Sequence, residues 1–213
     1  MYVRPPLESP NFVDGAGAYI PYGYRWGVDG PPDDAYSQCT HPERFAPLVE
    51  VARALVDHLI DAYDVDVSDT AMLPGWIAAA EVGSGSYPMT VTRLTPRNPA
   101  SASLTFIETA LPGVCVLAGA ACTNSVPQCG CDACDEGILE EADLLEEFVF
   151  AVIDGDFQET LTRTEVIEEW HSPSGSQHAS RMPRRVAAPE AIAALKAADR
   201  HKGASWAPWA SRQ

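Results

Sequence analysis

The residues of this chain best suited to chemistry are three cysteines that lie within six positions, Cys129, Cys131 and Cys134. A C-x-x-C pair is the usual two-ligand half of a tetrahedral zinc site, and Cys129 would add a third thiolate. Gly130 lets the backbone wrap closely around an ion. The spacing therefore predicts a zinc site, with a structural role favoured over a catalytic one.

The fourth ligand of such a site must come from outside this triplet. Cys122, seven residues before Cys129, is our first candidate. The others are Cys39 and His41, at the start of an expected helix, and Asp132 and Asp135 within the loop itself.

The same cysteines allow three other interpretations. An iron–sulfur cluster needs four thiolates, but the spacing matches neither ferredoxin pattern. A redox dithiol would use Cys131 and Cys134, just before a helix N-terminus that stabilises a thiolate. Asp132, Asp135 and Glu136 oppose that ionisation, whereas a zinc ion would neutralise the acidic loop. The last alternative is three reduced cysteines without a ligand.

A second candidate site lies near the N-terminus, where glycines bracket Tyr22, Arg25 and Trp26. The aromatic side chains could simply pin an extended arm onto the body of the protein. Alternatively, they form the rim of a ligand pocket in which Arg25 holds a carboxylate or another anion.

Motifs of the common enzyme classes do not occur in the sequence. There is no G-x-x-x-x-G-K-[ST], no G-x-G-x-x-G after a strand, no H-E-x-x-H and no G-x-S-x-G. Cys115 falls in an apolar strand and is expected in the core. We therefore expect a non-enzymatic interaction or regulatory protein, with a thiol redox enzyme or sensor as the alternative.

Charge limits the partners that we expect. The net charge is -16, and residues 1–170 carry 28 acidic and 7 basic side chains, whereas residues 171–213 carry 2 and 7. An acidic body repels phosphate backbones, which disfavours nucleic acid. The basic segment with Arg181, Arg184 and Arg185 would dock on the acidic body or on an acidic partner, either another protein or an acidic small molecule.

Two long helices are expected on either side of a group of strands. Thr40 and Glu43 have capping-box spacing before an apolar helical stripe from Phe45 to Tyr63. A second stripe begins at Ile138, and Gly155 should end that helix. The expected strands are Trp76–Val82, Met89–Leu94, Ser103–Thr109, Val114–Ala118, Phe157–Ile167 and Gly175–Met182, and a short helix should follow at Pro189–His201.

This order predicts an α+β fold, an antiparallel sheet of four to six strands flanked by two main helices and a short C-terminal helix. Residues 1–37 should be an extended arm, 38–186 a single α+β domain, and 187–213 a short helix with a Trp-containing tail. With no apolar run resembling a signal peptide or a membrane span, we expect a cytoplasmic protein with reduced cysteines and no membrane partner.

Three motifs in order carry a resemblance to a known family: Tyr22 to Gly27, His41 to Leu48, and Cys129 to Glu136. Together they resemble an uncharacterised family of actinobacterial proteins, over most of residues 20–185. The resemblance implies a shared fold and a bacterial cytosolic setting, and it implies no activity, because the family is one of unknown function.

Overall fold

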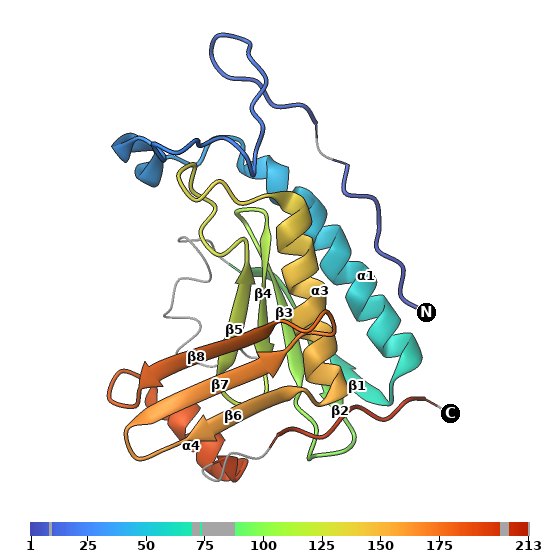
Figure 1. Ribbon diagram of the computed structural model, residues 1–213. Coiled ribbons are helices and arrows are strands. Elements are labelled where there is room, and N and C mark those ends of the chain that lie inside the picture. The colour runs from blue at the N-terminus through green and yellow to red at the C-terminus, as the bar shows by residue number, and fades with distance from the viewer. Residues whose placement is uncertain (9, 70–72, 74–87, 201–204, 213) are drawn as a thin grey trace.

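A computed structural model gives the architecture of most of the chain. The residues that it describes are 1–8, 10–69, 73, 88–200 and 205–212. The expected α+β class is confirmed, with a five-stranded antiparallel sheet, a separate three-stranded sheet, two long helices and a short C-terminal helix (Figure 1). The predicted strand Trp76–Val82 lies outside the described residues.

The larger sheet is an antiparallel meander in which each strand pairs with the next one along the chain. Its strands are β1 Val65–Ser68, β2 Pro88–Pro96, β3 Leu104–Thr109, β4 Gly113–Ala118 and β5 Cys122–Val126. The strands predicted at Ser103–Thr109 and Val114–Ala118 are confirmed as β3 and β4, which pair as a hairpin with Ile107 opposite Cys115. Cys115 is buried, as expected from its apolar strand.

The smaller sheet consists of β6 Phe157–Leu161, β7 Glu165–His171 and β8 Gln177–Pro183. The prediction of one strand over Phe157–Ile167 is wrong, because a turn divides it. The Thr162 hydroxyl makes this turn by accepting hydrogen bonds from the backbone N–H groups of Thr164 (3.2 Å) and Glu165 (2.8 Å).

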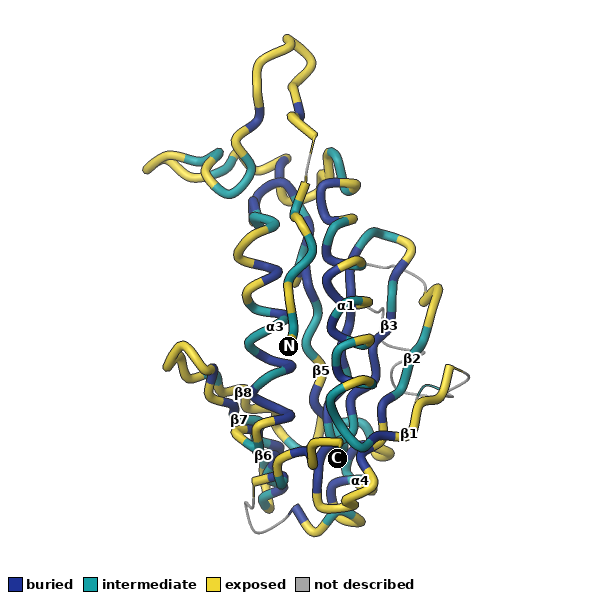
Figure 2. Tube along the Cα trace, turned by 90° about the vertical axis from the view of Figure 1, so that its right-hand side faces the viewer, coloured by how far each residue is buried: buried dark blue, intermediate teal, exposed yellow. Residues whose placement is uncertain are grey.

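Helices α1 and α3 lie side by side over one face of the larger sheet (Figures 1 and 2). The helical segments are η1 Asp33–Ser37, η2 Pro42–Phe45, α1 Ala46–Ala62, α3 Ile138–Asp154 and α4 Pro189–Ala197. Buried side chains of α1 and α3, including Leu55 and Phe148, share one core with Phe106 and Val116 of the sheet. As predicted, α3 ends at Gly155, which has a left-handed φ of 84°.

The expected capping box at the first long helix does not form. Thr40 makes no cap hydrogen bond to Glu43, whose carboxylate instead lies 3.0 Å from His41. The Thr40 hydroxyl and backbone N–H both donate to the side chain of Asp132. The short 3-10 segment η2 precedes α1. Thr40, which we expected to start the helix, is instead hydrogen bonded to the cysteine loop.

One buried carboxylate joins the two sheets. Glu159 of β6 has no exposed surface. It accepts hydrogen bonds from the N–H groups of Ala120 and Ala121 in the β4–β5 turn and of Cys122 at the start of β5 (2.7–3.1 Å). The Trp206 indole donates to the same group at 3.0 Å. Burial raises the pKa of Glu159, and these four donors oppose the rise.

The Trp-containing tail folds back onto the body of the protein. Trp206 and Trp209 are buried in the main core, and the Trp209 indole donates to the carbonyl of Ala102 at 2.8 Å.

Among the helices that the structure describes, none has the length and apolar character needed to cross a membrane.

Candidate metal centre

The three clustered cysteines occupy the loop between β5 and α3, and the fold brings their sulfur atoms together. The Sγ atoms of Cys129, Cys131 and Cys134 all lie within 4.8 Å of one another. Gly130, at a φ of 77°, makes the tight bend between the first two. Three thiols at this separation can hold a metal ion.

Glu136 fixes the start of this loop. Its carboxylate accepts hydrogen bonds from the backbone N–H groups of Cys129 (3.1 Å) and Gly130 (2.7 Å). These bonds hold the loop in its bent form without using any of the three sulfur atoms, which stay available as ligands.

The thiols differ in how easily they lose a proton. Burial opposes ionisation of Cys131, but N–H groups of Cys134 and Ala133 and the thiols of Cys129 and Cys134 donate to its sulfur, so its pKa is lowered. The hydrogen bond to Cys131 and burial raise the pKa of Cys134 to about 12. The neighbouring donors therefore favour ionisation of Cys131 over ionisation of Cys134.

Asp132 is the buried anchor of the loop, with 2% of its surface exposed. Its carboxylate accepts the two hydrogen bonds from Thr40 and lies 3.5 Å from the Arg25 guanidinium and 3.9 Å from that of Arg44. Since these groups already engage both carboxylate oxygens, Asp132 is poorly placed to serve as a metal ligand.

The N-terminal arm is tied to this loop through backbone contacts. The N–H groups of Asp132 and Ala133 donate to the carbonyls of Gln38 (2.8 Å) and Ala35 (3.2 Å). The Trp26 indole donates to the Asp132 carbonyl at 2.9 Å. The arm and the loop therefore form one unit at the same end of the molecule, beyond the N-terminus of α3 (Figure 1).

Cys39 belongs to this unit, and its side chain is exposed. Its two neighbours, Gln38 and Thr40, both hydrogen bond to Asp132. Burial raises the pKa of the Cys39 thiol, and the negative charges of Asp132, Cys131 and Cys129 raise it further, while Arg44 opposes the rise. Cys39 does not belong to the group of sulfurs within 4.8 Å, but it is near enough for their charges to act on it.

The other candidate ligands lie in different surroundings. Cys122 is buried in β5, where its thiol is within hydrogen-bonding reach of the Glu168 carboxyl, and it is not part of the group of three sulfurs. His41 contacts Glu43 and packs on Phe12. Asp135 accepts the Arg25 backbone N–H at 2.7 Å through Oδ2.

Tyr22, Arg25 and Trp26 lie together, as the ligand-pocket hypothesis requires. The Arg25 guanidinium carbon is 5.1 Å from the Tyr22 ring centre and 4.7 Å from that of Trp26. The Arg44 guanidinium carbon lies 4.2 Å from the centre of the same Tyr22 ring, so both arginines make cation–π contacts with Tyr22. Arg25 is directed at Asp132, so a carboxylate of the chain itself takes the position that we assigned to an external anion.

A second polar cluster was not foreseen from the sequence. A cavity of about 240 Å³ is lined in part by Cys122, Glu168 and His178. Burial, together with the charge of Glu159, raises the pKa of Glu168 to about 7. His178 stacks on Trp170 with ring centres 3.8 Å apart. Glu168 lies between Ile167 and Glu169 in β7, and no sequence signal marks it as half-buried in the structure.

Comparisons with known proteins give a family and no activity. Neither the curated proteins nor the solved structures contain a match to this chain. A family of unknown function matches residues 8–213, which include most of the arm, the cysteine loop and the C-terminal tail. The chain therefore belongs to this family of unknown function, DUF6226.

Proposed function

We propose that this chain is a non-enzymatic interaction or regulatory module in which a zinc ion at Cys129, Cys131 and Cys134 pins the loop to the N-terminal arm. The observation that carries the proposal is the mutual approach of the three sulfurs within 4.8 Å. Coordination to zinc would deprotonate all three thiols, and the charge of the ion would offset the repulsion between the thiolates.

Cys39 is the fourth ligand that we propose, in place of Cys122. Hydrogen bonds on both sides of Cys39 hold its backbone to the cysteine loop. Cys122 is engaged with Glu168 in a buried strand. Four thiolate ligands would make a closed structural site, with no open position for a substrate.

The experiment is metal analysis of protein purified without chelator, by mass spectrometry of the bound elements. We expect about one zinc per chain for the wild type, as the tight binding of such sites requires. Cys131→Ser should lose the metal, and Cys39→Ser should weaken its retention during dialysis. Cys115→Ser is the matched control, since Cys115 lies in β4 outside the loop, and it should retain zinc like the wild type. Less than about half an equivalent of zinc in the wild type would refute the proposal.

The second candidate function is a thiol redox enzyme or sensor that uses Cys131 and Cys134. The lowered pKa of Cys131 favours it, because the thiolate is the nucleophile in disulfide exchange. Cys131 would attack a disulfide of a partner molecule and release one thiolate. Cys134 would then displace the second, which leaves a Cys131–Cys134 disulfide and a reduced partner.

Thiol titration at neutral pH separates the two functions. Fast reaction of Cys131 in metal-free protein, and its loss in Cys131→Ser, would favour redox chemistry. Thiols that become reactive only after chelation would favour zinc.

A further inference from the structure

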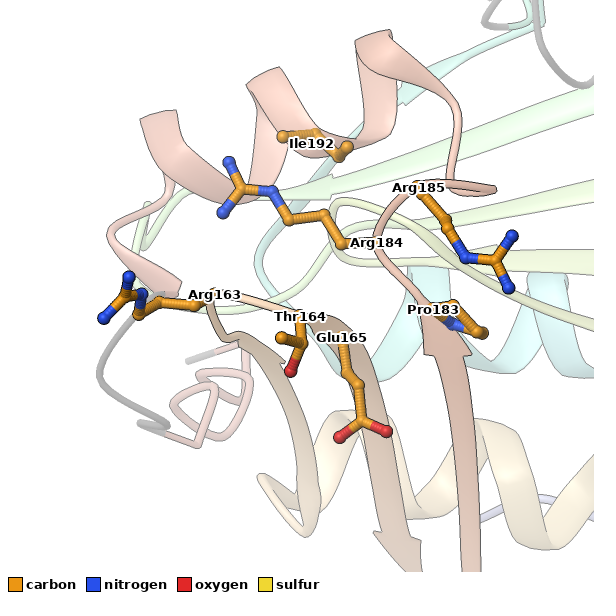
Figure 3. Close-up of a pocket in the computed structure, with 7 residues that line it drawn as sticks. All are labelled: Arg163, Thr164, Glu165, Pro183, Arg184, Arg185 and Ile192. Atoms are coloured by element: carbon orange, nitrogen blue, oxygen red, sulfur yellow. The ribbon is translucent and has the colours of Figure 1, made fainter.

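A pocket of about 690 Å³ lies apart from the cysteine loop, between the β6–β7 turn, the end of β8 and α4 (Figure 3). Arg163 comes from the turn, and Arg184 and Arg185 follow β8. Ile192 of α4 and Pro183 contribute apolar surface. Three arginines around one pocket are unusual in a chain with a net charge of -16.

The pocket has a framework that does not depend on a ligand. The Thr162 hydroxyl holds the turn that carries Arg163. The backbone N–H of Arg184 donates to the Thr164 carbonyl at 2.7 Å, and its guanidinium donates to the Thr162 carbonyl at 3.1 Å. The position of Arg184 is therefore set before any anion binds, which lowers the entropic cost of binding.

The charges of these arginines are not neutralised within the described part of the chain. None of Arg163, Arg184 and Arg185 forms an ion pair there, although arginines elsewhere pair with carboxylates, such as Arg4 with Glu146. Glu165 is the one carboxylate in the lining, and its side chain extends away from the arginines in Figure 3. Among the described residues, Arg184 and Arg185 of the basic segment therefore form no ion pair with a carboxylate of the acidic body.

The orientation of the side chains points to two of the three arginines. In Figure 3 the guanidinium groups of Arg163 and Arg184 extend to the same side of the pocket, while that of Arg185 extends to the opposite side. Two guanidinium groups that flank one space can each donate two hydrogen bonds to an oxyanion. A phosphate monoester, with two negative charges and three terminal oxygens, fits such a pair better than a single carboxylate does.

We propose that this pocket binds a small molecule that carries a phosphate group. Arg163 and Arg184 hold the phosphate, and the organic part of the molecule lies against Ile192 and Pro183. Arg185 adds long-range attraction. The proposal concerns a small ligand, because the net charge of -16 repels the phosphate backbone of a nucleic acid.

The test is isothermal titration of the full chain with phenyl phosphate and with inorganic phosphate, at constant ionic strength. We expect saturable binding, tighter for phenyl phosphate because its ring buries apolar surface. Arg163→Gln should weaken binding by about tenfold or more, since it removes a charge-assisted hydrogen-bonding group. Arg163 makes no hydrogen bond within the described residues, so this variant should keep the fold.

Arg97→Gln is the matched control, because it removes an equal charge outside the pocket. Arg97 pairs with Asp64, which directly precedes β1. It should bind phenyl phosphate within about twofold of the wild type. Equal weakening in both variants would reduce the effect to net charge and overturn the proposal. Tighter binding of succinate than of phenyl phosphate would overturn the choice of a phosphate, and an absence of binding would overturn the site itself.

Discussion

Asp132 connects the cysteine loop to the arm through a single buried side chain. Its carboxylate accepts two hydrogen bonds from Thr40 and lies between the guanidinium groups of Arg25 and Arg44. Removal of the charge would leave two arginines without their counterion in a largely buried position. Such uncompensated charges cost more than the net gain from the original pair.

Asp132→Asn should therefore lower the free energy of unfolding by about 2–4 kcal/mol, as expected when one member of a buried ion network is removed. Urea denaturation monitored by circular dichroism measures the change. Asp66→Asn is the control, because Asp66 is exposed and lies 3.9 Å from Arg97. Its effect should stay within about 0.5 kcal/mol, and a similar loss for both variants would contradict the anchoring role.

Glu168 makes the stability of the protein depend on pH near neutrality. Its pKa in the folded protein is about 7, because the half-buried carboxyl is partly desolvated and lies near the charge of Glu159, while an unfolded glutamate titrates near 4.5. The folded state holds the proton more tightly, so the contribution is complete at low pH and is lost as pH rises through 7.

Glu168→Gln should remove this dependence. Between pH 5 and pH 8 the wild type should lose about 2–3 kcal/mol relative to the variant, from about 1.4 kcal/mol per unit of pKa shift. Urea titrations of both proteins at a series of pH values give the difference, and Glu141, which is raised to about 7 as well, contributes equally to both. Parallel pH profiles would contradict the assignment.

At the scale of elements, Gly155 at the end of α3 has a left-handed backbone conformation and also lies in crowded surroundings. A Cβ atom at Gly155 would lie 3.0 Å from the backbone nitrogen of Pro208 and 3.1 Å from the Trp206 carbonyl oxygen. The glycine therefore allows both the helix stop and the close passage of the C-terminal tail.

Gly155→Ala should cost about 2–4 kcal/mol, which combines left-handed strain of about 1 kcal/mol with displacement of the tail. Gly175→Ala is the matched control, since Gly175 also has a positive φ of 96° but open space around it. Thermal unfolding of the two variants separates the terms. Equal losses would show that crowding by the tail contributes nothing.

The elements that sequence analysis predicted correctly are those with local signals. The apolar period and Gly155 define α3, and the tight turn before Gly113 defines the β3–β4 hairpin. The β6–β7 turn was missed because a threonine hydroxyl makes it, without glycine or proline. The start of the first long helix was misread because Asp132, distant in sequence, captures the cap residue Thr40.

The same reasoning explains what could be foreseen of the candidate site. Cys129, Cys131 and Cys134 are close in sequence, so their spacing alone predicts their approach in space. The place of Cys39 depends on backbone pairing between the arm and the loop, and that of Cys122 depends on the packing of two sheets. Neither long-range arrangement leaves a local pattern.

At the scale of the whole molecule, the contact between the arm and the cysteine loop shelters two arginines after which trypsin could cleave. Arg25 and Arg44 have 17% and 3% of their side chains exposed. If zinc joins the arm to the loop, its removal should release both arginines to the protease.

Chelation should accelerate tryptic cleavage after Arg25 by about tenfold or more, equivalent to roughly 1.4 kcal/mol of local opening. Mass spectrometry of timed digests with and without chelator measures the rate. Cleavage after Arg181, an exposed residue of β8, serves as the internal standard and should keep its rate. Equal rates after Arg25 in both conditions would separate the arm from the metal.

The pairing of the arm with the loop also affects the order of events during folding. Thr40 and Asp132 are 92 residues apart, and closing so long a loop is entropically costly before other contacts form. We therefore expect this contact between the arm and the loop to form late, whereas α1, the hairpin and α3 can form early. During that interval three neighbouring thiols are open to oxidants and to competing metals, so the fraction of correctly assembled protein should depend on the redox state and zinc supply of its surroundings while it folds.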